Sequence, residues 1–316
     1  MLTKESKIYI AGHRGMVGSA LMRRFEAAGY STLLTATHAQ LDLRDQGAVR
    51  AFFGAQRPDV VVLAAARVGG ILANSTRPAE FLYDNLMIGT NVIHAAQEVG
   101  VRKLLNLGSS CIYPRLAPQP LKEESLLTGP LEETNRAYAV AKIAAIELCD
   151  HFRTQYGSDF ISAMPTNLYG PGDNFDLNSS HVMPALMRKM VEAKEKGSVA
   201  VEVWGSGRPL REFLHVDDLA EACLFLLENV SRPGPINVGT GEDLSIRALA
   251  ELMAELVGYG GELKFDAGKP DGTPRKLLDV SLLRSLGWSA SIPLRQGVQQ
   301  TLAWYAHHRQ QGLVRA

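Results

Sequence analysis

The sequence of 316 residues predicts an α/β fold built around a doubly wound parallel sheet, with a smaller second lobe. Three observations predict this. Short apolar runs alternate with helical patterns up to about residue 165. One of these runs, residues 60–66 (VVVLAAA), is apolar at every position, as a strand buried on both faces is. Right-handed crossovers between parallel strands then require helices on both faces of the sheet.

Each element follows from local patterning, taken in chain order. Short apolar runs that end near glycine or polar residues predict strands at Lys7–Ala11, Ser31–Thr35, Val60–Ala66, Lys103–Gly108 and Asp159–Met164. Apolar residues at spacings of three and four predict helices at Met16–Ala28, Gln46–Gln56, Pro78–Gly100 and Thr134–Tyr156. Gly29 and Pro58 follow the first two helices, where such residues commonly end a helix.

Beyond Gly170 the alternation of strand and helix loosens, and loops rich in glycine, proline, asparagine and serine become frequent. We therefore expect residues 1–170 to form a nucleotide-binding domain. We expect residues 171–316 to form mainly a smaller C-terminal α/β lobe that binds substrate. A later segment, about residues 213–240, is a candidate to rejoin the first domain.

Charge and hydropathy exclude several classes of partner. Lysine plus arginine and aspartate plus glutamate each number 33, so the formal net charge is zero. No global field then attracts nucleic acid or an acidic membrane, and we expect neither as a partner. The longest apolar run, Val60–Ala66, is too short to span a bilayer. The first residues lack the apolar stretch of a signal peptide.

Cysteine usage indicates a reducing compartment. Cys111, Cys149 and Cys223 are odd in number, and no pair has the spacing of a disulfide framework or a metal site. Free thiols in a cytoplasmic protein are therefore expected. The eight histidines form no ligand cluster of recognisable spacing, so no metal site is expected.

A glycine-rich loop, residues 12–18 (GHRGMVG), lies between the first strand and the first helix. Glycines there let the backbone approach a pyrophosphate, and the helix N-terminus offers free N–H groups. The loop favours a Rossmann-type domain whose dinucleotide contacts Gly12, Gly15, Met16, Val17 and Gly18. Arg14 suits the 2′-phosphate of NADP, and it equally suits the pyrophosphate. No acidic residue immediately follows the second strand, which weighs mildly against NAD.

Tyr138 and Lys142 are four residues apart on a predicted helix, so their side chains share one face. A nearby ammonium lowers the pKa of a phenol, and such a pair can pass a proton to a carbonyl oxygen. Ser109 follows the fourth strand, at the edge of the sheet where ligands bind in open α/β folds. Its hydroxyl could hold the same oxygen.

The glycine motif, Ser109, Tyr138 and Lys142 resemble, in order and context, the extended short-chain dehydrogenase/reductases. The resemblance implies that the three side chains form a catalytic triad and that NADPH is the cofactor. It also implies that Asp42 reaches the adenine edge. The resemblance makes Ala64 and Asn167 further expected cofactor contacts, with Asn167 near the nicotinamide.

Seven stretches narrow the resemblance: AGHRGMVGSA, AAARVGGI, LGSSCIYP, YAVAKIA, MPTNLYGP, NSSHVMPAL and REFLHVDDLA. They are similar to the members of that family that convert GDP-4-keto-6-deoxy-D-mannose to GDP-L-fucose by 3,5-epimerisation and 4-reduction. This implies that Cys111 and His181 exchange protons at C3 and C5, without saying which is acid and which is base. It implies that Lys189, Trp204 and Arg211 bind the GDP-sugar, although Lys189 stands where relatives can carry arginine.

The resemblance further implies a homodimer formed through a four-helix bundle, with the 78–100 and 134–156 helices as the contributing pair. Asp217 and Asp218 open another helix, and we interpret them as a helix cap rather than a catalytic pair.

Two other functions stay open. A sugar-nucleotide 4-epimerase or 4,6-dehydratase shares the serine, tyrosine and lysine, but a dehydratase usually carries an acidic pair where this chain has Ser110 and Cys111. A non-catalytic sensor of NADP typically loses the tyrosine or the lysine, and both are present here.

Overall fold

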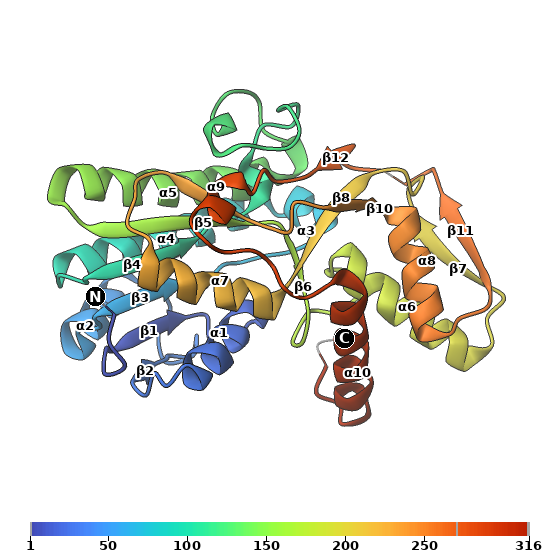
Figure 1. The fold of residues 1–316 in the computed structure, drawn as a ribbon, viewed down its shortest axis with the longest axis horizontal. Helices are drawn as coiled ribbons and strands as arrows, with labels where there is room; N and C mark the ends of the chain where they lie inside the picture. Colours follow the sequence, from blue (N-terminus) through green and yellow to red (C-terminus); the bar gives the residue numbers. More distant parts are fainter. Residues whose placement is uncertain (1, 270, 315–316) are drawn as a thin grey trace.

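The computed structural model describes residues 2–269 and 271–314, and its main layer is a six-stranded sheet in the order β2-β1-β3-β4-β5-β9 (Figure 1). Every neighbouring pair is parallel. The strands are β1 (Ile8–Ala11), β2 (Leu33–Leu34), β3 (Val60–Leu63), β4 (Lys103–Leu107), β5 (Asp159–Pro165) and β9 (Pro235–Val238). The predicted doubly wound parallel sheet is thereby confirmed.

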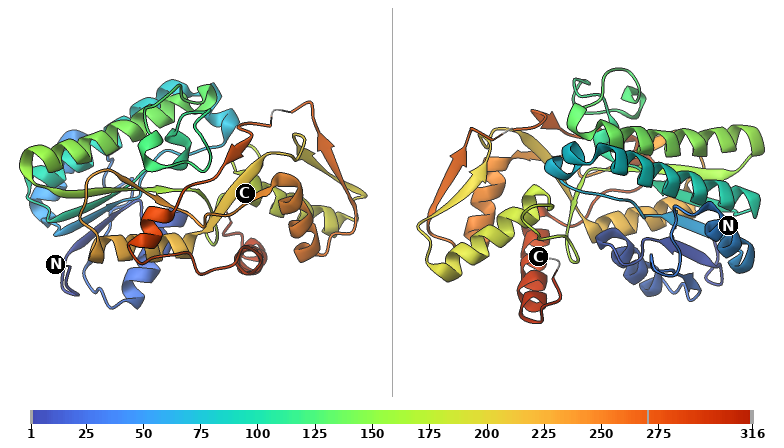
Figure 2. Two further views of the ribbon diagram at one scale, coloured as in Figure 1. Left: turned by 45° about the horizontal axis from the view of Figure 1, so that its top comes forward. Right: turned by 180° about the vertical axis from the view of Figure 1, so that it is seen from behind.

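Helices cover both faces of this sheet (Figure 2). On one face lie α1 (Met16–Ala27) and α7 (Val216–Asn229), and on the other lie α2 (Gln46–Gln56), α4 (Pro78–Glu98) and α5 (Arg136–Tyr156). Strand β1 shows why both faces are apolar: Ile8 and Ile10 pack into one buried cluster, and Tyr9 and Ala11 pack into the other. Alternate side chains of a strand point to opposite faces, so the strand is buried on both.

Several boundaries differ from the predicted ones. A short helix, α3 (Ile71–Thr76), precedes α4, and the sequence pattern did not reveal it. Arg77 separates the two with φ −131° and ψ 45°, and Pro78 begins α4, where a missing N–H costs nothing. The helix predicted to start at Thr134 begins as one 3-10 turn, η3 (Glu133–Asn135), before α5. The second strand, predicted at Ser31–Thr35, is only two residues long in the structure, Leu33–Leu34.

The second lobe is built from short strands and three helices. Strand β8 (Leu210–His215) is central and pairs with β6 (Asn167–Tyr169), β10 (Asp243–Ser245) and β12 (Arg275–Lys276). The strands β7 (Ala200–Trp204) and β11 (Glu262–Asp266) form a separate pair. The helices are α6 (Val182–Lys196), α8 (Ile246–Val257) and α10 (Leu294–Gln310), which share a buried cluster with these strands.

The chain passes between the lobes more than once. Strand β8 leads directly into α7, which packs on α1 of the first lobe, and β9 joins the main sheet beside β5. The short helix α9 (Ser281–Ser285) and the 3-10 turns η1 (Ser110–Ile112) and η2 (Glu123–Ser125) complete the elements. These crossings bring β6, β8 and β12 to the same side of the molecule as the carboxyl ends of β4 and β5 (Figure 1).

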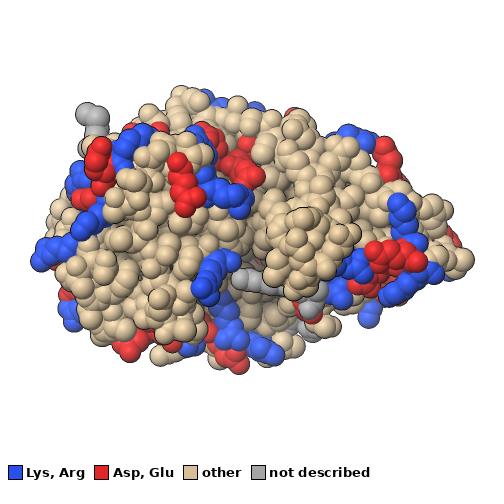
Figure 3. All heavy atoms as spheres, turned by 90° about the horizontal axis from the view of Figure 1, so that it is seen from below, with Lys and Arg blue, Asp and Glu red and all other residues tan. Residues whose placement is uncertain are grey.

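On the face drawn in Figure 3, basic and acidic side chains are interspersed over a largely uncharged surface. Within residues 2–269 and 271–314, no helix is both long enough and apolar enough to cross a membrane. In the same ranges, no three His, Cys, Asp or Glu side chains gather as a metal ion would need. All three cysteines are free thiols.

Candidate active site

The glycine loop after β1 has the shape that a pyrophosphate needs. Gly12 has φ +88°, and a Cβ there would lie 2.8 Å from the backbone of Ala65. A Cβ on Gly18 would lie 2.1 Å from the carbonyl oxygen of Gly12. Gly15 is the N-cap of α1 and offers no side-chain cap. The first N–H groups of α1 are therefore not capped by a side chain at Gly15, so this helix N-terminus fits a dinucleotide pyrophosphate.

Two of the remaining predicted cofactor residues, Ala64 and Arg14, lie at this loop. The N–H of Ala64 donates to the Ala11 carbonyl, 3.1 Å away, which holds the end of β3 against the end of β1. Arg14 is exposed within the loop. Asp42 follows β2, and its carboxylate accepts from the Arg44 guanidinium, with 2.7 Å between Oδ2 and Nη2. That pair holds the pKa of Asp42 at about 2.

Ser109 and Cys111 sit together at the carboxyl end of β4. Ser109 is the N-cap of η1, and its hydroxyl shares a hydrogen bond with the Cys111 thiol, with 2.9 Å between oxygen and sulfur. The side-chain amide of Asn135, just before α5, donates to the Cys111 carbonyl at 3.2 Å. The backbone that carries the thiol is thus fixed from two sides.

Tyr138 points into the same group from α5. Its residue is only 8% exposed, and burial raises the pKa of the phenol. Ionised Cys111 would raise this pKa further, whereas a hydrogen bond with Ser109 lowers it. The sequence predicted a pKa lowered by lysine, and that prediction is wrong for this structure because burial dominates. The phenol is therefore a proton donor at neutral pH.

Lys142 explains part of this difference. Its ammonium donates to the Leu107 carbonyl at 2.8 Å and lies 5.8 Å from the centre of the Tyr138 ring. Burial lowers the pKa of Lys142 to about 8. An amine that is directed at a carbonyl and titrates near neutrality exerts less pull on the phenol than a fully charged neighbour would.

The second lobe contributes His181, the N-cap residue of α6. Solvent reaches this residue, yet protein surrounds it closely enough that burial lowers the pKa of the imidazole. The positive charge of Lys276 lowers it further. Burial also lowers the pKa of Lys276, while ionised Cys111 raises it and Arg211 lowers it. Lys276 therefore lies within electrostatic reach of Cys111, His181 and Arg211.

Lys276 is a residue that the sequence interpretation missed. It pairs in register with Arg211, because β12 runs parallel to β8. Burial lowers the pKa of Arg211 as well, and nearby Asp271 opposes this. The available signal was the basic pair Arg275–Lys276 after a loop rich in glycine and proline. What brings Lys276 into the site is the pairing of β12 with β8, and this strand pairing is not visible in the sequence.

Glu212, next to Arg211, was also missed. It is fully buried, and its carboxylate accepts from the N–H groups of Thr240, Gly241 and Leu278 at 2.6, 2.8 and 3.0 Å. Its own carbonyl accepts from the side-chain amide of Asn167 at 2.7 Å. Asn167 thus belongs to a strand anchored to β8. Glu212 ties together the backbone segments that present Asn167, Arg211 and Lys276.

Lys189 and Trp204 lie farther out in the second lobe. Trp204 is 54% exposed, and its indole N–H donates to Glu202 at 2.9 Å. The Lys189 ammonium donates to the Glu202 carbonyl at 3.0 Å and lies 5.4 Å from the indole centre. These two residues contact each other, while Arg211 is grouped with Lys276 nearer the thiol.

The interpretation of Asp217 and Asp218 needs one correction. The N-cap of α7 is His215, whose Nδ1 accepts from the Asp217 N–H at 3.2 Å. Both aspartates stand in the first turn, where negative charge suits the helix dipole. The Asp218 carboxylate instead accepts from the N–H groups of Ser291 and Ile292, and so holds the loop before α10.

The fold and these groups define an enzyme that holds a nicotinamide dinucleotide beside a polar site. Residues 8–239 match the NAD dependent epimerase/dehydratase family, and the chain belongs to that family. The predicted family resemblance is thereby confirmed. The chain is 57% identical over 305 residues to GDP-L-fucose synthase 1 of Arabidopsis thaliana. The matched region covers 96% of this chain and 94% of that protein.

Two further relatives agree. GDP-L-fucose synthase of Escherichia coli (strain K12) is 53% identical over 314 residues, covering 96% of this chain and 98% of that one. A solved structure of a GDP-L-fucose synthetase from Naegleria fowleri bound to NADP is 30% identical, with a TM-score of 0.92. It covers all of this chain and 96% of that chain.

Proposed function

We propose that this chain converts GDP-4-keto-6-deoxy-D-mannose to GDP-L-fucose, by epimerisation at C3 and C5 and NADPH-dependent reduction at C4. The observation that carries the proposal is the hydrogen-bonded group of Ser109, Cys111 and Tyr138, faced from the second lobe by His181 and Lys276. Relatives more than half identical over nearly the whole chain bear the name of this activity.

The first-lobe residues suit a ketone at C4. Ser109 and Tyr138 are hydrogen-bond donors for its oxygen, and donors aimed at a developing oxyanion stabilise an enolate most strongly where water is excluded. Enolisation toward C3 or C5 needs a proton removed there. Tyr138 keeps its proton at neutral pH, because burial raises its pKa, and so it can later protonate the C4 oxygen.

Cys111 and His181 are suited to the two inversions because they come from opposite lobes. A sugar ring between them can lose a proton to one residue and regain one from the other on the opposite face. A thiol and an imidazole both titrate near enough to neutrality to exchange protons with water between the two events. Each inverted carbon therefore carries one proton that comes from solvent.

Arg211 and Lys276 supply the positive charge that a nucleoside diphosphate needs. Burial lowers the pKa of each, and Arg211 lowers that of Lys276 as well. Two neighbouring, partly buried cations repel each other, and a bound diphosphate would offset this repulsion. We place Lys189 and Trp204 farther along the same substrate, toward its guanosine end.

NADPH, when bound, supplies the hydride that reduces C4. Gly12, Gly15 and Gly18 would hold its pyrophosphate at the N-terminus of α1, and the exposed Arg14 would meet a 2′-phosphate. The preference for NADP over NAD belongs to this proposal.

The test uses the purified protein, GDP-4-keto-6-deoxy-mannose and NADPH in deuterated water. Oxidation of NADPH, with deuterium at both C3 and C5 of a GDP-fucose product, is expected. Reduction without deuterium at either carbon would mean a simple keto-sugar reductase and would remove the roles of Cys111 and His181. No turnover would move the substrate to the 4-epimerase or 4,6-dehydratase alternative.

We further propose a cytoplasmic homodimer in which α4 and α5 form a four-helix bundle with their partner copies. The two helices pack along each other, and Tyr83, Val140 and Tyr156 leave apolar surface exposed on them, at 59%, 42% and 56%. Free thiols are consistent with a reducing compartment. Sedimentation equilibrium is expected to give twice the mass of the chain, and Val140→Glu is expected to halve it.

A further inference from the structure

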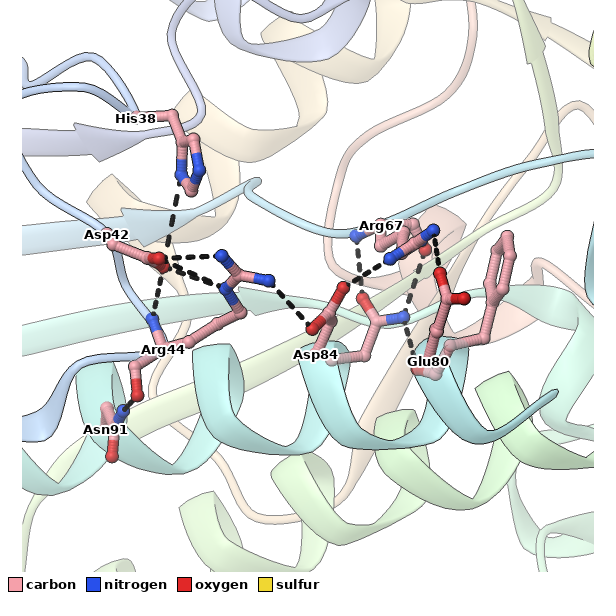
Figure 4. A network of polar contacts seen from close by, with 9 residues as sticks. His38, Asp42, Arg44, Arg67, Glu80, Asp84 and Asn91 are labelled. Carbon is pink, nitrogen blue, oxygen red and sulfur yellow. Dashed lines mark hydrogen bonds and ion pairs between the residues drawn. The ribbon is translucent and has the colours of Figure 1, made fainter. Parts of the chain in front are cut away.

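Helix α4 carries a row of charged contacts with Asp84 at its centre (Figure 4). Asp84 is only 7% exposed. Its Oδ1 accepts from Arg44 at 3.1 Å, and its Oδ2 accepts from Arg67 at 2.7 Å. One buried carboxylate thus bridges two guanidinium groups that come from two different loops.

The first loop is the one that follows β2. Arg44 also donates to the Asp42 carboxylate, through its Nε and Nη2 atoms. The side-chain amide of Asn91 donates to the carbonyls of Leu43 and Arg44 at 3.0 Å each. Figure 4 shows these contacts as one row along α4. Residues 42–44 are therefore fixed on this helix.

The second loop follows β3, and we call residues 67–74 the bridging segment. Its first residue, Arg67, reaches Asp84 and Glu80 with its side chain. Its backbone exchanges two hydrogen bonds with the side chain of Asn85, at 2.8 and 3.0 Å. The start of the bridging segment is thus held to α4 by side chain and backbone together.

The far part of the bridging segment touches the second lobe. The N–H of Gly70 donates to the Ser179 carbonyl at 3.2 Å, and a Cβ on Gly70 would lie 3.2 Å from the Ser180 carbonyl. The amide of Asn74 closes the turn by donating to the Gly69 carbonyl at 2.7 Å. Ser179 and Ser180 immediately precede His181. The backbone before His181 therefore rests on the bridging segment.

We propose that Asp84 is a positioning residue for the epimerisation: through Arg67 it fixes the bridging segment, and the bridging segment fixes His181 opposite Cys111. This rests on the function proposed above. Removing the Asp84 charge leaves two cations without their shared partner, which loosens both loops. A shift of about 1 Å in a proton-transferring group can lower its rate about 100-fold. Ser109, Tyr138 and Lys142 are held by β4 and α5, so the reduction of C4 is affected less.

Epimerisation at C3 and C5 is therefore slowed more than reduction at C4, and the ratio of products measures this difference. Asp84→Asn is compared with wild type and with Glu98→Gln, which removes another α4 carboxylate from an arginine, Arg50, at the far end of the helix. Each protein is given GDP-4-keto-6-deoxy-mannose and NADPH, and the products are analysed by NMR. Asp84→Asn is expected to release at least a tenth of its product reduced at C4 without inversion at C3 or C5. Wild type and Glu98→Gln are expected to release only the doubly inverted sugar.

Three outcomes overturn the proposal. Asp84→Asn could give only the inverted product at the wild-type rate, it could lose exchange and reduction in equal proportion, or Glu98→Gln could show the same premature reduction. If Asp84→Asn does not fold, Arg67→Met leaves Asp84 paired with Arg44 and must give the same premature reduction. A wild-type protein that forms no inverted product overturns the proposed function itself, and this inference with it.

Discussion

The hydroxyl oxygen of Ser109 lies 2.9 Å from the sulfur of Cys111, so the residue that would hold the substrate oxygen directly contacts a residue that would move a proton. Both stand in the single turn that follows β4. In the proposed reaction, the carbonyl reduced at C4 and the carbons epimerised beside it would therefore be served from one short stretch of backbone. The opposite face would be served by His181, the N-cap residue of α6 in the second lobe.

The first prediction separates the two proton-transfer residues from the reduction. Cys111→Ser and His181→Asn are expected to slow deuterium exchange at C3 and C5 by about 100-fold or more, since a positioned acid or base contributes that much. Reduction of the ketone is expected to continue, because Ser109, Tyr138 and Lys142 remain. Exchange is measured by NMR and reduction by the absorbance of NADPH. Exchange at the wild-type rate in both variants would remove these residues from the mechanism.

The second prediction concerns the glycine loop. Gly18→Ala puts a Cβ 2.1 Å from the Gly12 carbonyl oxygen, so the loop or α1 must shift. We expect a loss of stability of about 3 kcal/mol, as in an overpacked core, and no measurable binding of NADPH. Gly54→Ala in α2 is the matched control, because its Cβ meets nothing within 4 Å and helix propensity rises by up to about 1 kcal/mol. Unfolding in urea and NADPH fluorescence measure the two effects. Normal cofactor binding by Gly18→Ala would contradict the assigned role of this loop.

The first lobe could be predicted from the sequence because its strands are apolar on both faces and its helices are long. A strand such as β3 (VVVL) is apolar at every position, so the sequence predicts that it is buried on both faces. The second lobe could not be predicted in the same way. Its central sheet uses β10 (DLS) and β12 (RK), which are too short and too polar to show any period.

The same limit applies to the site. Ser109, Tyr138 and Lys142 could be proposed as site residues from the sequence, because their order along the chain and their local spacing form a recognisable motif. Lys276 could not, because its place beside Arg211 arises from a pairing between strands 65 positions apart (276 minus 211). The raised pKa of Tyr138 was missed for a similar reason: the depth of burial depends on what packs over α5, and spacing along the helix does not report it.

The third prediction concerns pH and stability, and it rests on Asp173. This residue is 6% exposed, its Oδ1 accepts from the Asn174 N–H at 2.7 Å, and its Oδ2 has no hydrogen-bond partner among the described residues. Burial raises the pKa of the Asp173 carboxyl to about 7. An unfolded aspartate has a pKa of about 3.9, so the folded state holds the proton more tightly.

The stabilisation linked to that proton is complete below about pH 4 and is lost as pH rises through about 7. Asp173→Asn carries no such proton. Relative to wild type, its free energy of unfolding is expected to rise between pH 4 and pH 8, by at most roughly 4 kcal/mol for a carboxyl whose pKa is about 7 when folded. Urea unfolding of both proteins across this range measures the difference. Parallel stability curves would show that Asp173 does not titrate in this window.

The last prediction concerns Lys276. Its charge lowers the pKa of His181, after burial, so Lys276→Met is expected to raise that pKa. His181 would then stay protonated to a higher pH, and the limb of deuterium exchange that needs neutral imidazole would move to higher pH. The KM for the GDP-sugar is expected to rise about 10- to 100-fold, as the loss of one charge-assisted hydrogen bond implies.

The control for Lys276 is Lys264→Met on β11, since Lys264 is exposed and lies 3.7 Å from Glu262. This variant is expected to leave both the pH profile and KM unchanged. A raised KM with an unchanged pH profile would limit Lys276 to binding the diphosphate. An unchanged KM with a shifted profile would place it beside the proton-transfer pair but away from the substrate phosphates. If neither quantity changes, Lys276 has no part in the site, and the positive charge at the join of β8 and β12 must be assigned to Arg211 instead.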